Sequence, residues 1–109
     1  MASDIQERIV RNEATFRSIN EDIERGRDAE DDQTLIGFVC ECGSAECSRL
    51  IELTPAEYEQ VRTDPCTFAV VNGHEITAVE SVVERHDRYA IVRKLASSGV
   101  LAKETDPRA

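Results

Sequence analysis

The chain contains no tryptophan and few other aromatic residues, with three phenylalanines and two tyrosines among 109 residues. This scarcity excludes an interior built mainly from large rings, so we expect a core of isoleucine, valine and leucine. The length is that of a single domain. A domain of this size gains considerably from a bound structural metal.

Basic residues are also scarce: 13 lysines and arginines stand against 22 aspartates and glutamates, which gives a formal net charge of −9. The acidic residues are spread along the whole chain. A polyanion would meet net repulsion on most faces, which argues against a general nucleic-acid binder and against binding to anionic membranes. The expected partners are other proteins or small ligands.

Long apolar runs are missing. No stretch approaches the length of a membrane-spanning helix, and residues 1–7 lack the basic region and the apolar block of a secretory leader. We therefore expect a cytoplasmic protein. In that compartment, clustered cysteines form metal or redox sites more often than structural disulfides.

Familiar catalytic motifs are absent as well. The sequence has no glycine-rich phosphate loop, no Gly-x-Ser-x-Gly motif and no arrangement of serine, histidine and aspartate with a readable context. These absences favour a binding protein over an enzyme.

The most informative feature that is present is a cluster of three cysteines, Cys40, Cys42 and Cys47. Zinc prefers thiolate ligands, and a Cys-x-Cys pair on an extended strand points both side chains to the same face. Three sulfurs leave one tetrahedral position, which His74 is placed to fill because Asn72-Gly73 predicts a tight turn. The sequence thus predicts a zinc site with these four side chains as ligands.

Three alternatives remain open for this cluster. In the first, Cys66 replaces His74 and the site is all-sulfur; in the second, no metal binds and the thiols stay reduced or undergo reversible disulfide chemistry. In the third, the zinc is catalytic and Glu75 serves as the base. The carboxylates of Glu41 and Glu46 would raise the pKa of the neighbouring thiols, which argues against a freely reactive nucleophile.

An amphipathic helix is predicted over residues 1–26. Ser3 and Gln6 form a capping-box signature at its start, and Gly26 is a typical terminator. Five apolar residues recur at alternating heptad spacings: Ile5, Ile9, Phe16, Ile19 and Ile23. This apolar seam predicts a helix laid across the domain's own sheet, or a contact with a second copy or a partner helix in which Asn12 sets the register.

The remaining chain predicts an acidic linker over 27–33, a zinc-stabilised α+β domain over 34–95 and a flexible tail over 96–109. Strands of a small antiparallel sheet are predicted over 35–39, 49–53, 67–71, 79–83 and 89–95. The first two form a hairpin whose turn carries the cysteines. A second capping box, Thr54 with Glu57, predicts one helix inserted between strands over 55–63.

A resemblance covers nearly the whole chain. The segments that carry it are Arg11–Glu13, Phe16-Arg17, Asn20-Glu21, Phe38–Cys42, Cys47, Glu57–Glu59, Val61-Arg62, Gly73–Glu75 and Asp106–Arg108. In this pattern the sequence resembles a family of small uncharacterised actinobacterial proteins. The resemblance supports His74 as the partner of the three cysteines, and it implies no activity.

Taken together, the observations predict a small cytoplasmic zinc-binding protein in which a structural metal supports a protein-interaction or regulatory module. The expected contact surface is the apolar seam, facing a protein partner or a second copy. Two other functions stay open, a thiol-based redox or metal sensor and a small zinc hydrolase.

Overall fold

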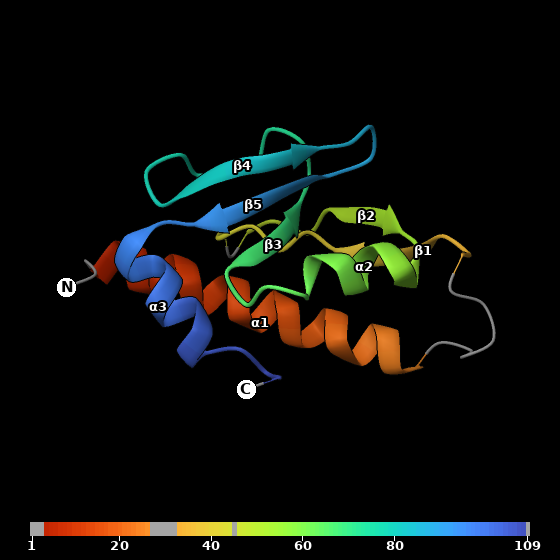
Figure 1. The fold of residues 1–109 in the computed structure, drawn as a ribbon, viewed down its shortest axis with the longest axis horizontal. Coiled ribbons are helices and arrows are strands. Elements are labelled where there is room, and N and C mark those ends of the chain that lie inside the picture. The colour runs from red at the N-terminus through yellow and green to blue at the C-terminus, as the bar shows by residue number, and fades with distance from the viewer. Residues whose placement is uncertain (1–3, 27–32, 45, 109) are drawn as a thin grey trace.

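A computed structural model describes residues 4–26, 33–44 and 46–108 of the chain. Ser3 of the first predicted capping box and residues 27–32 of the predicted linker lie outside the described residues. The elements, in chain order, are α1 (Asp4–Gly26), β1 (Ile36–Val39), β2 (Leu50–Leu53), α2 (Pro55–Val61), β3 (Thr67–Val70), β4 (Glu80–Arg85), β5 (Ala90–Lys94) and α3 (Ala96–Glu104) (Figure 1). The predicted α+β class, with an N-terminal helix and one helix inserted between strands, is confirmed.

The strands form two antiparallel sheets, where the sequence predicted one. β1 pairs with β2 from Ile36 opposite Leu53 to Val39 opposite Leu50, which confirms the hairpin around the cysteines. The second sheet has the order β3-β5-β4. Among the described residues, the segment after β1 makes one main-chain hydrogen bond to the free edge of β3: the Glu41 N–H donates to the Ala69 carbonyl. The Ala69 N–H donates instead to the Glu41 side chain, so the two sheets stay separate.

The inserted helix α2 begins as the sequence predicted. The Thr54 hydroxyl accepts a hydrogen bond from the Glu57 N–H at 3.1 Å, and the Glu57 carboxylate accepts one from the Thr54 N–H at 2.8 Å. This reciprocal cap pairs two donors that the first turn would otherwise leave unpaired. The helix packs Tyr58 and Val61 inward.

The predicted flexible tail over 96–109 is wrong. Residues 96–104 form α3, which packs against α1 (Figure 1). Ion pairs bind the chain beyond α3. Asp106 contacts Arg62 at 2.5 Å, and Arg108 contacts Glu21 at 2.7 Å. Small side chains permit the close packing of α3, since Ser98 and Ala102 are buried.

Isoleucine, valine and leucine form the largest group of buried apolar residues, as predicted, and four of the five aromatic residues are buried with them. Phe38, Tyr58, Phe68 and Tyr89 are all buried. The rings of Phe38 and Tyr58 stack with their centroids 4.5 Å apart. Aliphatic side chains fill the space around these rings in two clusters.

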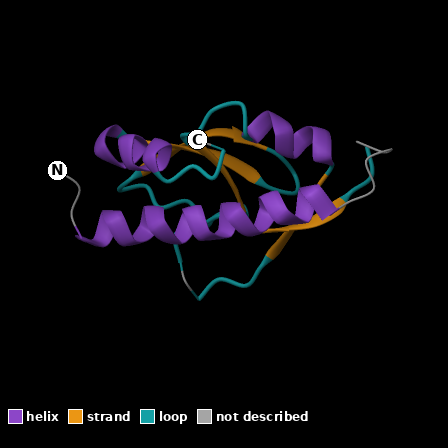
Figure 2. Ribbon diagram, turned by 90° about the horizontal axis from the view of Figure 1, so that it is seen from below, coloured by secondary structure: helices purple, strands orange, loops and turns teal. Residues whose placement is uncertain are grey.

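Helix α1 runs along most of the molecule's length and lies across the other elements, as Figure 2 shows from below. Its inner face is largely polar: the buried residues are Val10, Glu13, Arg17, Asn20 and Glu21. Within the apolar seam, Ile5 is 70% and Ile19 41% exposed, whereas Ile9, Phe16 and Ile23 are half-buried and Ile23 packs against the core. The prediction of a helix laid across the domain is therefore correct, but the most deeply buried side of the helix is polar.

Candidate metal centre

The first two cysteines directly extend strand β1. The Cys40 N–H donates to the Arg49 carbonyl at 2.9 Å, so the hairpin ladder continues past the assigned strand. Cys42 follows two residues later, and both cysteines are buried. Residues two apart on an extended chain share a face, which places both sulfurs on one side and Glu41 on the other.

The loop after Cys42 passes close against α1. Gly43 is required there, because a Cβ atom at this position would lie 2.3 Å from the Ile9 side chain. The Asn12 side-chain amide donates to the Gly43 carbonyl at 3.0 Å. Asn12 is thus engaged within its own chain, which argues against the register role predicted for it. Beyond Gly43 the loop brings the half-buried Cys47 back toward Cys40.

The fourth predicted ligand comes from the turn after β3. Gly73 has a φ of +93°, a backbone conformation that glycine adopts without strain. The next residue, His74, donates its N–H to the Val71 carbonyl at 2.9 Å, which closes the turn. As the sequence predicted, this sharp turn carries the imidazole to the cysteine cluster.

The structure brings together all four predicted side chains. The Nδ1 atom of His74 lies 3.7 Å from the Sγ atoms of both Cys40 and Cys47. The four ligand atoms, including Sγ of Cys42, all lie within 4.8 Å of one another, so the group could hold a metal ion. A sulfur and a nitrogen bound to one tetrahedral zinc are about 3.5 Å apart, given bonds of about 2.3 and 2.0 Å. The spacing therefore fits a tetrahedral metal.

Cys66, the alternative fourth ligand, lies elsewhere. Its thiol is buried and donates to the Gly99 carbonyl on α3 at 3.5 Å. Among the described residues it is not part of the group that could hold an ion. Its role is that of a small buried side chain in the packing of α3.

The surroundings of the sulfurs disfavour free thiolates. Burial raises the pKa of Cys40, although a hydrogen bond from the Val71 N–H, at 3.1 Å, acts in the opposite direction. Burial likewise raises the pKa of Cys42. A cation at the centre would supply the charge that favours deprotonation. The arrangement suits metal ligands better than unassisted nucleophiles.

Glu75, the base that a zinc hydrolase would need, is held by other groups. Its carboxylate accepts hydrogen bonds from the Gly73 N–H at 3.0 Å and from Arg85 at 2.9 Å. Hydrogen bonding from its own N–H, followed by that from Arg85, lowers the pKa of Glu75. A carboxylate with a lowered pKa is a poor general base at neutral pH, so the geometry gives the hydrolase hypothesis no support.

The environment of Glu41 is not predicted from the sequence, where this residue is considered only as an acidic neighbour of the thiols. The Glu41 carboxylate is fully buried and accepts hydrogen bonds from Asn20, Tyr58 and Ala69. The available signal was the strand alternation itself, because a residue between two inward-facing ligands must point to the opposite side.

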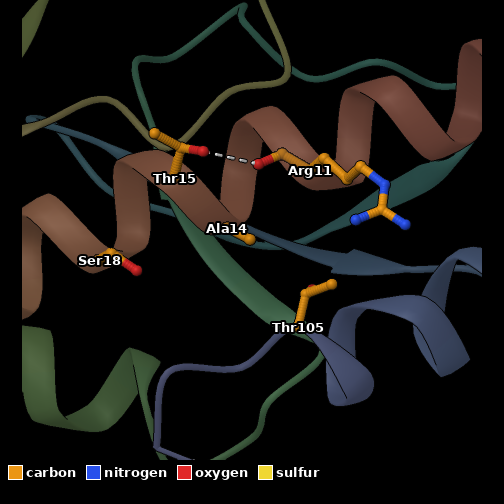
Figure 3. A pocket seen from close by; sticks show the side chains of 5 residues that line it. All are labelled: Arg11, Ala14, Thr15, Ser18 and Thr105. Carbon is orange, nitrogen blue, oxygen red and sulfur yellow. Dashed lines mark hydrogen bonds between the residues drawn. The ribbon is translucent and has the colours of Figure 1, made fainter.

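A shallow hollow lies between α1 and the end of α3 (Figure 3). Its lining residues are Arg11, Ala14, Thr15, Ser18 and Thr105. The hydroxyls of the two threonines donate to carbonyls of their own helices. The lining has no metal-ligating or nucleophilic cluster, so the metal centre remains the candidate site.

No family model matches the chain, and no curated protein or solved structure is similar enough to match it. The family resemblance drawn from the sequence therefore stays a prediction. Within the described part of the chain, no helix combines the length and the hydropathy that crossing a membrane requires.

Proposed function

We propose that Cys40, Cys42, Cys47 and His74 bind one Zn²⁺ ion in a structural site, and that the domain so stabilised acts as a protein-interaction module. The observation that carries this proposal is the convergence of the four ligand atoms within 4.8 Å. Three sulfurs and an imidazole form a donor set typical of structural zinc.

A structural role is favoured over a catalytic one because four protein ligands complete a tetrahedral sphere. A catalytic zinc keeps one position for water or substrate. The ligands also come from separate parts of the fold: the end of β1, the loop before β2 and the turn after β3. One cation would thus crosslink the hairpin to the three-stranded sheet.

The ligand set can be tested with matched cysteine variants. We expect the wild-type protein to contain one zinc per chain by elemental analysis. Cys47→Ser should lower zinc affinity by more than the roughly 10- to 100-fold that is typical when a residue that orients a metal ligand is lost. Cys66→Ser, whose hydroxyl can still donate to Gly99, should keep its zinc. A wild-type protein without zinc, or equal zinc affinity in both variants, would contradict the assignment.

The interaction role is supported by the orientation of α1. Its inner face is polar, and its apolar seam (Ile5, Ile9, Phe16, Ile19 and Ile23) is partly open to solvent. Heptad spacing suits contact with another helix. We infer that this seam binds the seam of a second copy, in an association weakened by the net charge of −9 on each chain.

Self-association through the seam predicts a specific response to charge and salt. Ile5→Glu with Ile19→Glu should weaken dimerisation by at least about tenfold, because each places a charge in an apolar contact. Raised salt should strengthen the wild-type dimer by screening the repulsion. Sedimentation equilibrium measures both effects. Val100→Glu is the control, since Val100 is 58% exposed on α3 and is not one of the seam residues. A wild-type protein that stays monomeric at millimolar concentration would refute the dimer.

A further inference from the structure

Glu41 lies between Cys40 and Cys42, two of the proposed zinc ligands, and its carboxylate accepts three hydrogen bonds. Glu41 lies opposite the sulfurs of Cys40 and Cys42 and is fully buried. Its Oε2 atom accepts hydrogen bonds from the Tyr58 hydroxyl at 2.8 Å and from the Asn20 amide at 2.9 Å. Its Oε1 atom accepts one from the Ala69 N–H at 3.0 Å.

These three donors belong to three different elements. Asn20 is on α1, Tyr58 on α2 and Ala69 on β3. Hydrogen bonds to an ionised acceptor are shorter and stronger than those between neutral groups, and a buried carboxylate is tolerated only when it is so paired. The carboxylate is therefore a junction at which both helices and the three-stranded sheet meet the metal-binding strand.

The same segment is also held through its main chain. The Glu41 N–H donates to the Ala69 carbonyl at 2.8 Å. The Asn20 side chain forms two hydrogen bonds with the main chain of Val39: it accepts one from the Val39 N–H at 2.8 Å and donates one to the Val39 carbonyl at 2.9 Å. A rotation of the strand about its axis would break all of these bonds together. Because the sulfurs lie on the opposite face of that strand, the bonds fix the direction in which Cys40 and Cys42 point.

We propose that Glu41 is a positioning residue of the metal centre, which preorganises the Cys40 and Cys42 thiolates for the metal without touching it. This inference rests on the zinc site of the proposed function. Residues that orient metal ligands typically contribute about 10- to 100-fold in affinity. The function of Glu41 is thus to make zinc binding depend on the docking of α1 and α2.

Three substitutions separate positioning from charge. Glu41→Gln keeps the shape but places an amide donor against the donors that surround it. Glu41→Asp keeps the charge but is one methylene too short to reach all three donors. Glu46→Gln removes an exposed charge next to Cys47 and is the matched control. Zinc affinity is measured by competition with a chromophoric chelator, and circular dichroism checks the fold of each loaded variant.

Both Glu41 variants are expected to lose zinc affinity by about 10- to 100-fold, whereas Glu46→Gln stays within about threefold of wild type. The visible d–d bands of the Co²⁺-loaded Glu41 variants should also shift, because these bands report the geometry of the ligands around the metal. Wild-type affinity in Glu41→Asp, or an equal loss in Glu46→Gln, would show that charge and not position matters. Unchanged Co²⁺ spectra would overturn the proposal as well.

Tyr58→Phe provides a milder variant in case the Glu41 substitutions disturb folding. It removes one of the three donors and keeps the ring stacked on Phe38. A smaller loss of affinity with a Co²⁺ spectrum shifted in the same direction supports the proposal, and wild-type affinity with a wild-type spectrum refutes it. Failure of the zinc site itself would be recognised differently, because the wild-type protein would then bind neither metal.

Discussion

Removal of the metal is expected to lower the melting temperature of the domain by tens of degrees. Structural zinc contributes an apparent free energy of about 10–16 kcal/mol in small zinc domains, whereas the unfolding free energy of a whole protein is about 5–15 kcal/mol. The crosslink at the centre is therefore comparable to the total stability of the chain. Calorimetry of zinc-loaded and chelator-treated protein measures the difference.

The loss of structure on metal removal should begin at the metal centre and spread to α1. Without the cation, the Val71 N–H would donate to a neutral thiol on Cys40, and a neutral acceptor forms a weaker hydrogen bond than a thiolate. The loop at Gly43 would also be free to leave its contacts with Ile9 and Asn12. Hydrogen exchange of the metal-free protein should thus rise at Val71 and His74 before it rises in the β4–β5 hairpin.

Two controls test whether the fall in melting temperature comes from loss of the metal. Cys66→Ser should lose the same number of degrees on chelation as wild type, because Cys66 lies outside the group that could hold an ion. Addition of zinc to the stripped protein should restore the original melting curve. If stripped and loaded proteins melt together and have the same circular dichroism spectrum, the metal has no structural role.

The features predicted correctly are those encoded by neighbouring residues. The cap formed by Thr54 and Glu57 and the turn at Gly73 each depend on a few consecutive positions. The spacing of Cys40 and Cys42 likewise determines which face they share. Such local signals sufficed to predict the hairpin and the convergence of the four ligands.

The features that were missed depend on residues far apart in the sequence. The inner face of α1 is polar because its partners are Lys94, Glu41 and Arg62, contributed by distant segments. Amphipathicity alone favours burial of the apolar seam, so it does not predict that the most deeply buried side of α1 is polar. A second helical period of polar residues was present in the sequence: Glu13, Arg17, Asn20 and Glu24 recur at spacings of four, three and four.

The first residue of that polar period has an unusual environment. Glu13 is fully buried, and its Oε1 atom lies 2.6 Å from Nζ of Lys94, which also pairs with Glu80. Two carboxylates thus share one ammonium group beside the ring of Phe68. Burial, reinforced by the charge of Glu80 and partly offset by Lys94, raises the pKa of Glu13 to about 8. At neutral pH the folded protein therefore holds a proton on Glu13.

This proton predicts a loss of stability as the pH rises. Between the ordinary pKa of a glutamate, about 4.3, and the folded value of about 8, the folded state binds a proton that the unfolded state has released. The free energy of unfolding then falls with rising pH, by at most about 1.4 kcal/mol per pH unit. Glu13→Gln replaces the protonated carboxyl with a neutral group that cannot titrate. Relative to wild type, it should gain on the order of 3 to 4 kcal/mol between pH 5 and pH 8.

The pH dependence that Glu13 gives to the free energy of unfolding must be separated from that of the metal ligands, because zinc binding to thiolates and imidazole strengthens as the pH rises. Denaturant unfolding with saturating zinc, analysed as the difference between Glu13→Gln and wild type at each pH, cancels that contribution. Glu7→Gln, on the same helix and half-exposed in its pair with Arg11, is the control variant, measured at the same pH values. A flat difference for Glu13→Gln would mean that Glu13 is ionised throughout and forms an ordinary ion pair with Lys94. A gain in the free energy of unfolding that grows with pH would establish that Glu13 is uncharged beside Lys94. An uncharged Glu13 explains how two buried carboxylates are tolerated beside a single lysine.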